Sequence, residues 1–356
     1  MGKYEIPNIP VVNLTKKQKE RKRELLANEV KQIKIKGENN ISNLVDSFAE
    51  SSFEARNIGL AAQLYYKKLH TDTAIIWSLS GSIFSAGLRQ ITIDSIRANQ
   101  VDALVCTGAL FEQDMLEALG HKHYACNPLQ DDSELQSLYI DRIYDHLLDE
   151  VALRQVDLTF KKISENVPKG NYSSREFMKI CGQWLSQTKE VKDSVMQAAF
   201  EEDIPIFIPA INDCSIGIGL AMQQKERNGM TIDSIKDLKE IAFMKSKCGE
   251  SGIIVVGGGV PKNYAQDAVV MAEMLGFNVE KHKFGIQIST ADLRDGGLSG
   301  STLKEAISWG KNDKIMEEIM VWGEATVFFP LLIGYINQKM GNQKRKRRKL
   351  SNIFQS

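Results

Sequence analysis

Residues 252–259 read Gly-Ile-Ile-Val-Val-Gly-Gly-Gly, a short continuous apolar run that ends in three glycines. Such a run, without polar alternation, is typical of a strand that is buried on both faces of a sheet. Glycines directly after it predict a tight turn in which the backbone can approach a ligand. Taken alone, a triple glycine is more often an ordinary turn, and it is not the G-x-G-x-x-G pattern of dinucleotide-binding loops.

The same arrangement recurs along the chain. Further apolar runs occupy residues 74–79, 101–106, 204–208, 284–288 and 319–322. Helical periodicity marks residues 42–68, most of 136–200, and the stretches between the strands. Continuous apolar strands separated by helices predict an α/β fold with a doubly wound, mostly parallel sheet and helices on both faces, of the Rossmann-like kind. We expect three parts: a polar N-terminal arm (1–40), a single α/β domain (41–340) and a basic C-terminal tail (341–356).

Composition favours a protein of the cytoplasm with a sizeable core. The 356 residues are 43% hydrophobic and 25% charged, and no apolar run reaches the roughly 20 residues that a membrane helix needs. Five cysteines without a C-x-x-C pair indicate free thiols, so we expect neither disulfides nor a metal site. Outside residues 344–349 the net charge is −6, which suits cationic ligands.

Two basic stretches carry weaker signals. Residues 16–23 and the run Lys-Arg-Lys-Arg-Arg-Lys at 344–349 are strongly positive. Neither has interleaved aromatic residues, so we expect no nucleic-acid partner. The tail could be a nuclear address, but a solvated, disordered end is the stronger expectation.

The segment Glu305-Ala306-Ile307-Ser308-Trp309-Gly310-Lys311 carries the strongest chemical signal. Thr302, three residues before Glu305, forms a capping-box pattern that predicts a helix from Thr302, and Gly310 is a typical helix terminator. A lysine beside an indole ring and partly removed from water can lose its proton and act as an amine nucleophile. Most lysines at helix ends, however, are simply solvated cations.

These residues resemble the active-site segment of deoxyhypusine synthase. The resemblance extends over about residues 42–340 and includes Phe53–Gly59, Ser85–Arg89, Val105–Gly108, Pro209–Ser215, Gly257–Lys262 and Phe329–Leu332. It implies that Lys311 carries a covalent imine and that NAD is the cofactor. The NAD-lining residues implied are Ser82, Thr107, Gly108, Ala109, Asp213, Ser215, Gly257, Gly258, Gly259, Thr290, Ala291, Glu324 and Ala325. On this basis Gly258→Val is expected to exclude NAD with little harm to the fold.

The amine-binding side departs from the family. Ile218, Asn263 and Leu298 stand where the family has polar or charged groups that hold spermidine. Glu305 and Trp309 are retained, so the candidate substrate-binding residues are Glu305, Trp309 and Asn263. A buried ammonium without a carboxylate costs several kcal/mol, so spermidine should bind poorly.

The expected function is therefore that of a transferase of alkyl groups. It would move an aminoalkyl group between small diamines or guanidino-amines through a lysine imine, giving a homospermidine-like or agmatine-derived product. The alternatives are an orthodox deoxyhypusine synthase that modifies a translation-factor lysine with spermidine, and a catalytically impaired regulatory paralogue or NAD-binding partner subunit. The resemblance also implies a homotetramer, with the N-terminal arm over a neighbouring subunit.

Overall fold

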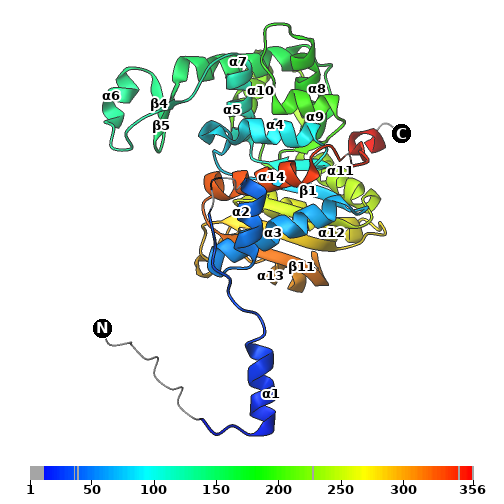
Figure 1. Cartoon of the computed structure of the whole chain (residues 1–356). Helices are drawn as coiled ribbons and strands as arrows, with labels where there is room; N and C mark the ends of the chain where they lie inside the picture. The colour runs from blue at the N-terminus through cyan, green and yellow to red at the C-terminus, as the bar shows by residue number, and fades with distance from the viewer. Residues whose placement is uncertain (1–11, 36, 38–39, 227, 344, 355–356) are drawn as a thin grey trace.

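A parallel sheet forms the centre of the protein. The computed structural model describes residues 12–35, 37, 40–226, 228–343 and 345–354 (Figure 1). Six strands lie in the order β11-β10-β9-β1-β2-β7, and every neighbouring pair runs parallel. Their bounds are β1 Ala74–Leu79, β2 Ala103–Cys106, β7 Ile206–Phe207, β9 Ser251–Val256, β10 His282–Ser289 and β11 Asn312–Trp322. The predicted doubly wound, mostly parallel α/β fold is confirmed.

Helices surround this sheet, except α1, which stands apart from the body, and α6, which lies on a projection (Figure 1). Their bounds are α1 Lys16–Leu25, α2 Ile41–Ala49, α3 Phe53–Leu69, α4 Arg89–Arg97, α5 Gly108–Ala118, α6 Asp132–Ser137, α7 Glu150–Glu165, α8 Ser174–Gln187, α9 Val195–Glu201, α10 Ser215–Glu226, α11 Ser234–Lys247, α12 Gly259–Met274, α13 Glu305–Ser308 and α14 Ala325–Met340, with the short helices η1 Phe84–Leu88, η2 Leu293–Asp295 and η3 Leu350–Phe354. Small strands β3 Tyr124–Ala125, β4 Ile140–Ile143, β5 His146–Asp149, β6 Asn171–Tyr172 and β8 Thr231–Ile232 complete the fold.

Both faces of the sheet are covered because successive strand residues point to opposite sides. In β1, Trp77 packs into a large cluster with residues of α3 and α14, and its ring meets Phe329 of α14 at 5.3 Å between centroids. Its neighbour Ile76 packs on the other face, with Met244 of α11 and Ala268 of α12. This arrangement explains why the strands read as unbroken apolar runs.

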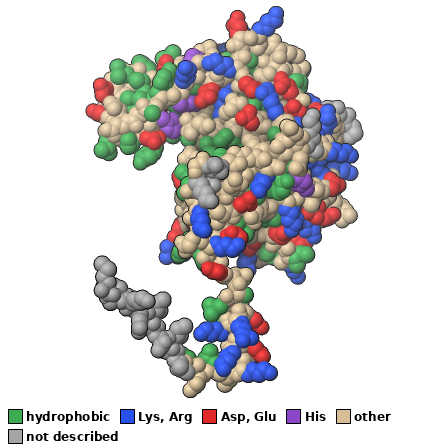
Figure 2. All heavy atoms as spheres, viewed as in Figure 1, with side chains coloured by type: hydrophobic (Ala, Val, Ile, Leu, Met, Phe, Trp, Pro, Cys, Tyr) green, Lys and Arg blue, Asp and Glu red, His purple; other side chains and the backbone are tan. Residues whose placement is uncertain are grey.

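Two predicted helical stretches are modified in the structure. The pattern over residues 42–68 is two helices, α2 and α3, because the chain turns at Ser51 and Ser52. Within residues 136–200, positions 140–149 form the strands β4 and β5 instead of helix. These strands join β3 in an antiparallel sheet that projects with α6 from the body (Figure 1). Apolar side chains gather on this projection, Leu129 among them (Figure 2).

The basic tail is packed against the body, contrary to the expectation of a solvated end. Arg345 forms a bidentate ion pair with Asp102, with distances of 2.7 and 3.1 Å, and only 6% and 1% of the two side chains are exposed. Arg345 also donates to the carbonyl of Thr73 at the start of β1. Lys344 lies outside the described residues.

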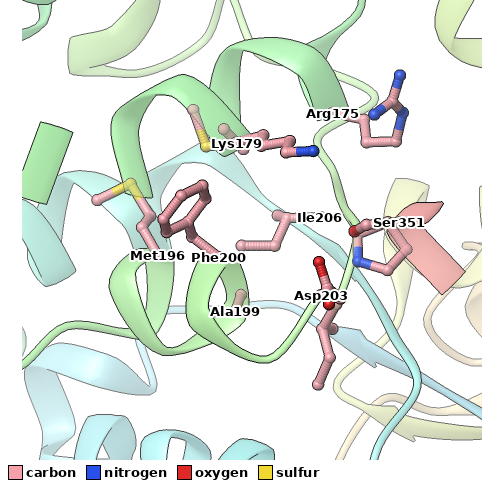
Figure 3. A pocket seen from close by; sticks show the side chains of 11 residues that line it. Arg175, Lys179, Met196, Ala199, Phe200, Asp203, Ile206 and Ser351 are labelled. Atoms are coloured by element: carbon pink, nitrogen blue, oxygen red, sulfur yellow. The ribbon is translucent and has the colours of Figure 1, made fainter. Parts of the chain in front are cut away.

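The rest of the tail continues this contact along the N-terminal edge of the sheet. Arg347 pairs with Glu202 at 3.0 Å, Arg348 with Asp72 at 2.5 Å and Lys349 with Asp203 at 3.3 Å. In η3, the Ser351 N–H donates to the Asp203 carbonyl. Figure 3 shows Ser351 beside Asp203 in a cavity of about 10 Å³, room for about one water molecule.

Candidate active site

The carboxyl ends of the strands open into two adjoining cavities. The first has a volume of about 350 Å³ and lies between the ends of β2 and β7 and the start of α12. The second, of about 420 Å³, lies between the end of β10 and the start of α14. They share Ser80, Gly81, Ser82, Gly258 and Ser299, so a single elongated ligand could occupy both. This edge is where ligands bind in open parallel sheets.

Twelve of the thirteen residues expected to bind the cofactor line these two cavities. The expected residues that line the first cavity are Ser82, Thr107, Gly108, Ala109, Asp213, Gly258 and Gly259. Those that line the second are Ser82, Gly257, Gly258, Thr290, Ala291, Glu324 and Ala325. The exception is Ser215, which is 1% exposed and lines neither.

The triple-glycine turn lines both cavities, Gly258 and Gly259 the first and Gly257 and Gly258 the second. Gly257 and Gly259 have φ angles of 79° and 65°, a backbone conformation that residues other than glycine rarely adopt. Gly258 is different, because a Cβ there would lie 2.5 Å from the Ser299 Cα. Gly258→Val would therefore clash with the Ser299 backbone and disturb this part of the fold, contrary to the expectation of a harmless substitution.

A buried hydroxyl group without a hydrogen-bond partner also indicates a site for a polar ligand. Thr107 Oγ1 is buried, lines the first cavity, and has no hydrogen-bond partner among the described residues. The N-terminus of the 16-residue helix α12 borders the same cavity, through Gly259, Val260 and Pro261. Free N–H groups at a helix N-terminus attract anions such as phosphate. The two features together fit a dinucleotide.

Carboxylates gather beside the first cavity. Glu112 of α5 accepts a hydrogen bond from the Ser215 N–H at 2.9 Å. Burial raises the pKa of Glu112, and burial likewise raises the pKa of Asp157 on α7. Asp213, at the cavity wall, adds a nearby negative charge that also raises the pKa of Glu112. A cationic group entering on this side would be favoured.

Lys311 is presented by a one-turn helix. The Glu305 N–H donates to Thr302 Oγ1 at 3.0 Å, which is one of the two hydrogen bonds of the predicted capping box. The helix α13, however, covers only Glu305–Ser308, with Lys304 as its N-cap, and does not begin at Thr302. Gly310, with φ of 78°, ends the turn, as predicted. The Lys311 N–H closes it by donating to the Ala306 carbonyl at 3.2 Å.

The Lys311 side chain is held by two groups on α12. Its Nζ lies 2.8 Å from Asp267 Oδ1 and 2.7 Å from Asn263 Oδ1, and only 12% of the side chain is exposed. The same Nζ lies 5.5 Å from the centre of the Trp309 ring, a cation–π distance. The structure thus brings Lys311, Asn263 and Trp309 together, as the sequence suggested. Glu305 is exposed on α13, and no direct contact joins it to Lys311.

A second lysine lies close to this group. Lys262 is 1% exposed, and its ammonium donates to the carbonyls of Leu298 and Ser301 and to the Ser301 hydroxyl. Burial lowers its pKa to about 8; Glu305 opposes this shift, and Lys311 adds to it. Lys262 is therefore an amine of this region with a substantial neutral fraction near physiological pH.

Sequence analysis missed Asp267 and treated Lys262 only as part of a motif. The usable signal was helical spacing, because Gly259, Asn263 and Asp267 follow at intervals of four and lie on one face of α12. Ile218 and Leu298, which replace family polar groups, are 50% and 44% exposed and offer no charge to an ammonium.

Two classes of feature are absent from the part of the chain that the structure describes. It contains no group of three or more His, Cys, Asp or Glu residues arranged to hold a metal ion. Nor does any described helix combine the length and the apolar character that crossing a bilayer requires.

Comparison with known proteins points to one family. A family model described as deoxyhypusine synthase matches residues 43–336. A deoxyhypusine synthase-like protein of Chlorobaculum parvum is 45% identical over 314 residues, which cover 87% of this chain and 89% of that protein. One from Coxiella burnetii is 43% identical over 318 residues, covering 88% and 90%. A crystal structure assigned to a deoxyhypusine synthase of Entamoeba histolytica shares the fold, with a TM-score of 0.59 at 18% identity, covering 88% of this chain and 99% of that one.

Proposed function

The chain belongs to the deoxyhypusine synthase family, and from that premise we propose that it is an NAD-dependent transferase of aminoalkyl groups between small amines. Family membership implies a transferase and suggests a polyamine-type substrate. The finer assignment rests chiefly on one observation: the Lys311 amine is held beside Trp309, Asn263 and Asp267, and the last two belong to α12, the helix whose first residues line the first cavity.

The residues present fit NAD. Gly257–Gly259 and the start of α12 would hold the phosphates, and Thr107, whose buried hydroxyl lacks a partner, would bind a polar group of the dinucleotide. Glu324 is the N-cap of α14, accepts from the Thr326 N–H at 2.8 Å, and is placed to meet a ribose. When bound, NAD would supply reversible hydride transfer at the carbon next to the substrate amine.

The chain's own residues would perform the group transfer. Neutral Lys311 Nζ attacks the imine carbon of the oxidised substrate, the new C–N bond forms, and the bond to the departing amine breaks. That amine leaves with a proton, and the alkyl group stays on Lys311 as an imine. A second amine then attacks the same carbon and frees Lys311 Nζ. Trp309 would cover the reacting cation with its ring face.

The amine partners distinguish this proposal from its alternatives. Ile218 and Leu298 offer no carboxylate, which favours small diamines or agmatine over spermidine and also favours an impaired regulatory paralogue as the second candidate. We propose a homotetramer, because Trp309 is 67% exposed in the single chain and a neighbouring subunit would cover it.

We expect product from small amines supplied with catalytic amounts of NAD. The enzyme is incubated with putrescine, agmatine or spermidine, singly and in pairs, and products are identified by mass spectrometry. A secondary amine from putrescine or agmatine is the expected result. Modification of a hypusine-precursor protein with spermidine would instead support an orthodox deoxyhypusine synthase. Binding of NAD without any product would support the regulatory paralogue.

Filling the first cavity should block the cofactor. Ala109 is the second residue of α5 and lines this cavity, so Ala109→Trp places an indole where the dinucleotide would lie, without a helix-breaking residue. We expect NAD affinity by calorimetry to fall at least about tenfold, since several contacts are lost together. Val327→Trp, at an exposed position of α14 that lines neither cavity, is the control and should bind NAD normally. Unchanged affinity in a folded Ala109→Trp protein would refute the cofactor assignment.

A further inference from the structure

The ion pair between Lys311 and Asp267 carries a consequence for substrate binding. Asp267 and Asn263 lie one turn apart on α12, and both offer an oxygen to the same ammonium, at 2.8 and 2.7 Å. Gly259, one turn before Asn263 on the same face, lines the first cavity. Asp267 therefore lies about 12 Å from Gly259 along the helix axis.

The orientation of the two acceptors is fixed. Asn263 Nδ2 donates to Asp267 Oδ2 at 2.6 Å, which turns its Oδ1 toward Lys311. An ammonium has only donors, so a carboxylate oxygen beside an amide oxygen is a matched receptor for it. Lys311 itself demonstrates that a primary ammonium fits there. The Asp267 side chain remains 33% exposed, so the carboxylate is accessible from solvent.

The other charged groups nearby do not offer an equivalent receptor. The Lys262 ammonium, behind this pair, is already saturated by three oxygen acceptors. Glu305 is exposed on α13 and influences Lys262 only through its charge. Where the family places polar groups for the amine, Ile218 and Leu298 are apolar.

We propose that Asp267, with Asn263, is the binding site for the primary ammonium end of the amine substrate, and that this ammonium displaces Lys311. The inference rests on the function proposed above, in which Lys311 must become a free amine. The exchange is balanced in charge: the substrate ammonium replaces the Lys311 ammonium at Asp267, and Lys311 releases its proton to bulk water. The substrate chain then extends along α12 toward the first cavity, past Asn263. Asp267 is thus a positioning residue that selects cationic diamines.

The test measures amine binding, separately from turnover. Putrescine is titrated by calorimetry into the NAD-loaded protein and its variants. Asp267→Asn should weaken putrescine binding by roughly 10- to 100-fold, the usual effect of a lost charge-assisted hydrogen bond. Lys311→Ala should strengthen it several-fold, because the competing ammonium is gone. These opposite signs are the signature of competition for one carboxylate.

Two controls separate this effect from a structural one. Asp46→Asn removes a comparable carboxylate, paired with Lys339 at 2.7 Å and 36% exposed, from the α2–α14 contact, and should leave putrescine affinity unchanged. Asp267→Glu keeps the charge and should restore part of the affinity. Thermal unfolding of each variant verifies that it is folded.

The outcomes distinguish this inference from the proposed function. If Asp267→Asn binds putrescine as the wild type does, or if Lys311→Ala does not bind it more tightly, the displacement is refuted. The displacement is also refuted if neither putrescine nor agmatine binds the wild-type protein. If the binding pattern holds but no product forms, the ammonium site stands and the transferase assignment fails. If product forms with no dependence on Asp267, the transferase assignment stands and the ammonium site is refuted.

Discussion

Lys311→Arg will abolish amine transfer while leaving NAD binding unchanged. The guanidinium keeps the positive charge and can still pair with Asp267, but it does not deprotonate in the physiological range and cannot form the imine. We expect the rate to fall at least about a thousandfold, as it does when a covalent nucleophile is removed. Product formation is followed by mass spectrometry, and NAD affinity by calorimetry.

Chemical trapping identifies the nucleophile directly. Borohydride added during turnover reduces a lysine imine to a stable alkyl adduct, which peptide mapping should place on Lys311. Lys262 is the informative rival, because burial lowers its pKa to about 8 and it lies close to Lys311. Lys262→Met should therefore retain the adduct on Lys311. An adduct on Lys262, or residual transfer by Lys311→Arg, would show that the assigned nucleophile is wrong.

The second large effect concerns stability. Arg345→Ala should lower the free energy of unfolding by about 3–5 kcal/mol, the usual result when one partner of a buried ion pair is removed. The reason is Asp102, which is 1% exposed and would keep its charge without the 2.7 Å guanidinium contact. Among the described residues, Asp102 would retain the hydrogen bond from the Ile75 N–H at 2.8 Å as its remaining polar contact. Urea unfolding followed by circular dichroism measures the change.

A surface arginine provides the matched control. Arg154 pairs with Glu150 at 2.5 Å on α7, with 59% and 29% of the side chains exposed, so Arg154→Ala should cost less than about 1 kcal/mol. In the double variant Arg345→Met, Asp102→Asn, the unpaired charge is gone and much of the stability should return. A loss for Arg345→Ala no larger than that for Arg154→Ala would contradict the structural role of the tail.

The sequence by itself determined the layered fold and the edge of the sheet at which the two cavities open. The run over residues 252–256 and its five counterparts are local patterns: a strand buried on both faces must be apolar throughout, and its end must turn. The resemblance to deoxyhypusine synthase, rather than the strand pattern, supplied the thirteen expected cofactor residues, and twelve of them line the two cavities. The strands β4 and β5 were not predicted, because short, half-exposed segments within a helical region show little strand periodicity.

Only the tertiary structure decided which charges meet. Asp267 and Lys311 are 44 positions apart in the sequence, and their pairing depends on how α13 lies against α12. Arg345 and Asp102 are 243 positions apart. A run of six basic residues predicts a solvated tail, and only the fold shows that one of them pairs with the buried Asp102 carboxylate. Periodicity records the environment of one segment, whereas an ion pair depends on two segments brought together by the whole fold. Lys311 was therefore visible in the sequence as the proposed nucleophile, but the Asp267 carboxylate that pairs with it was not.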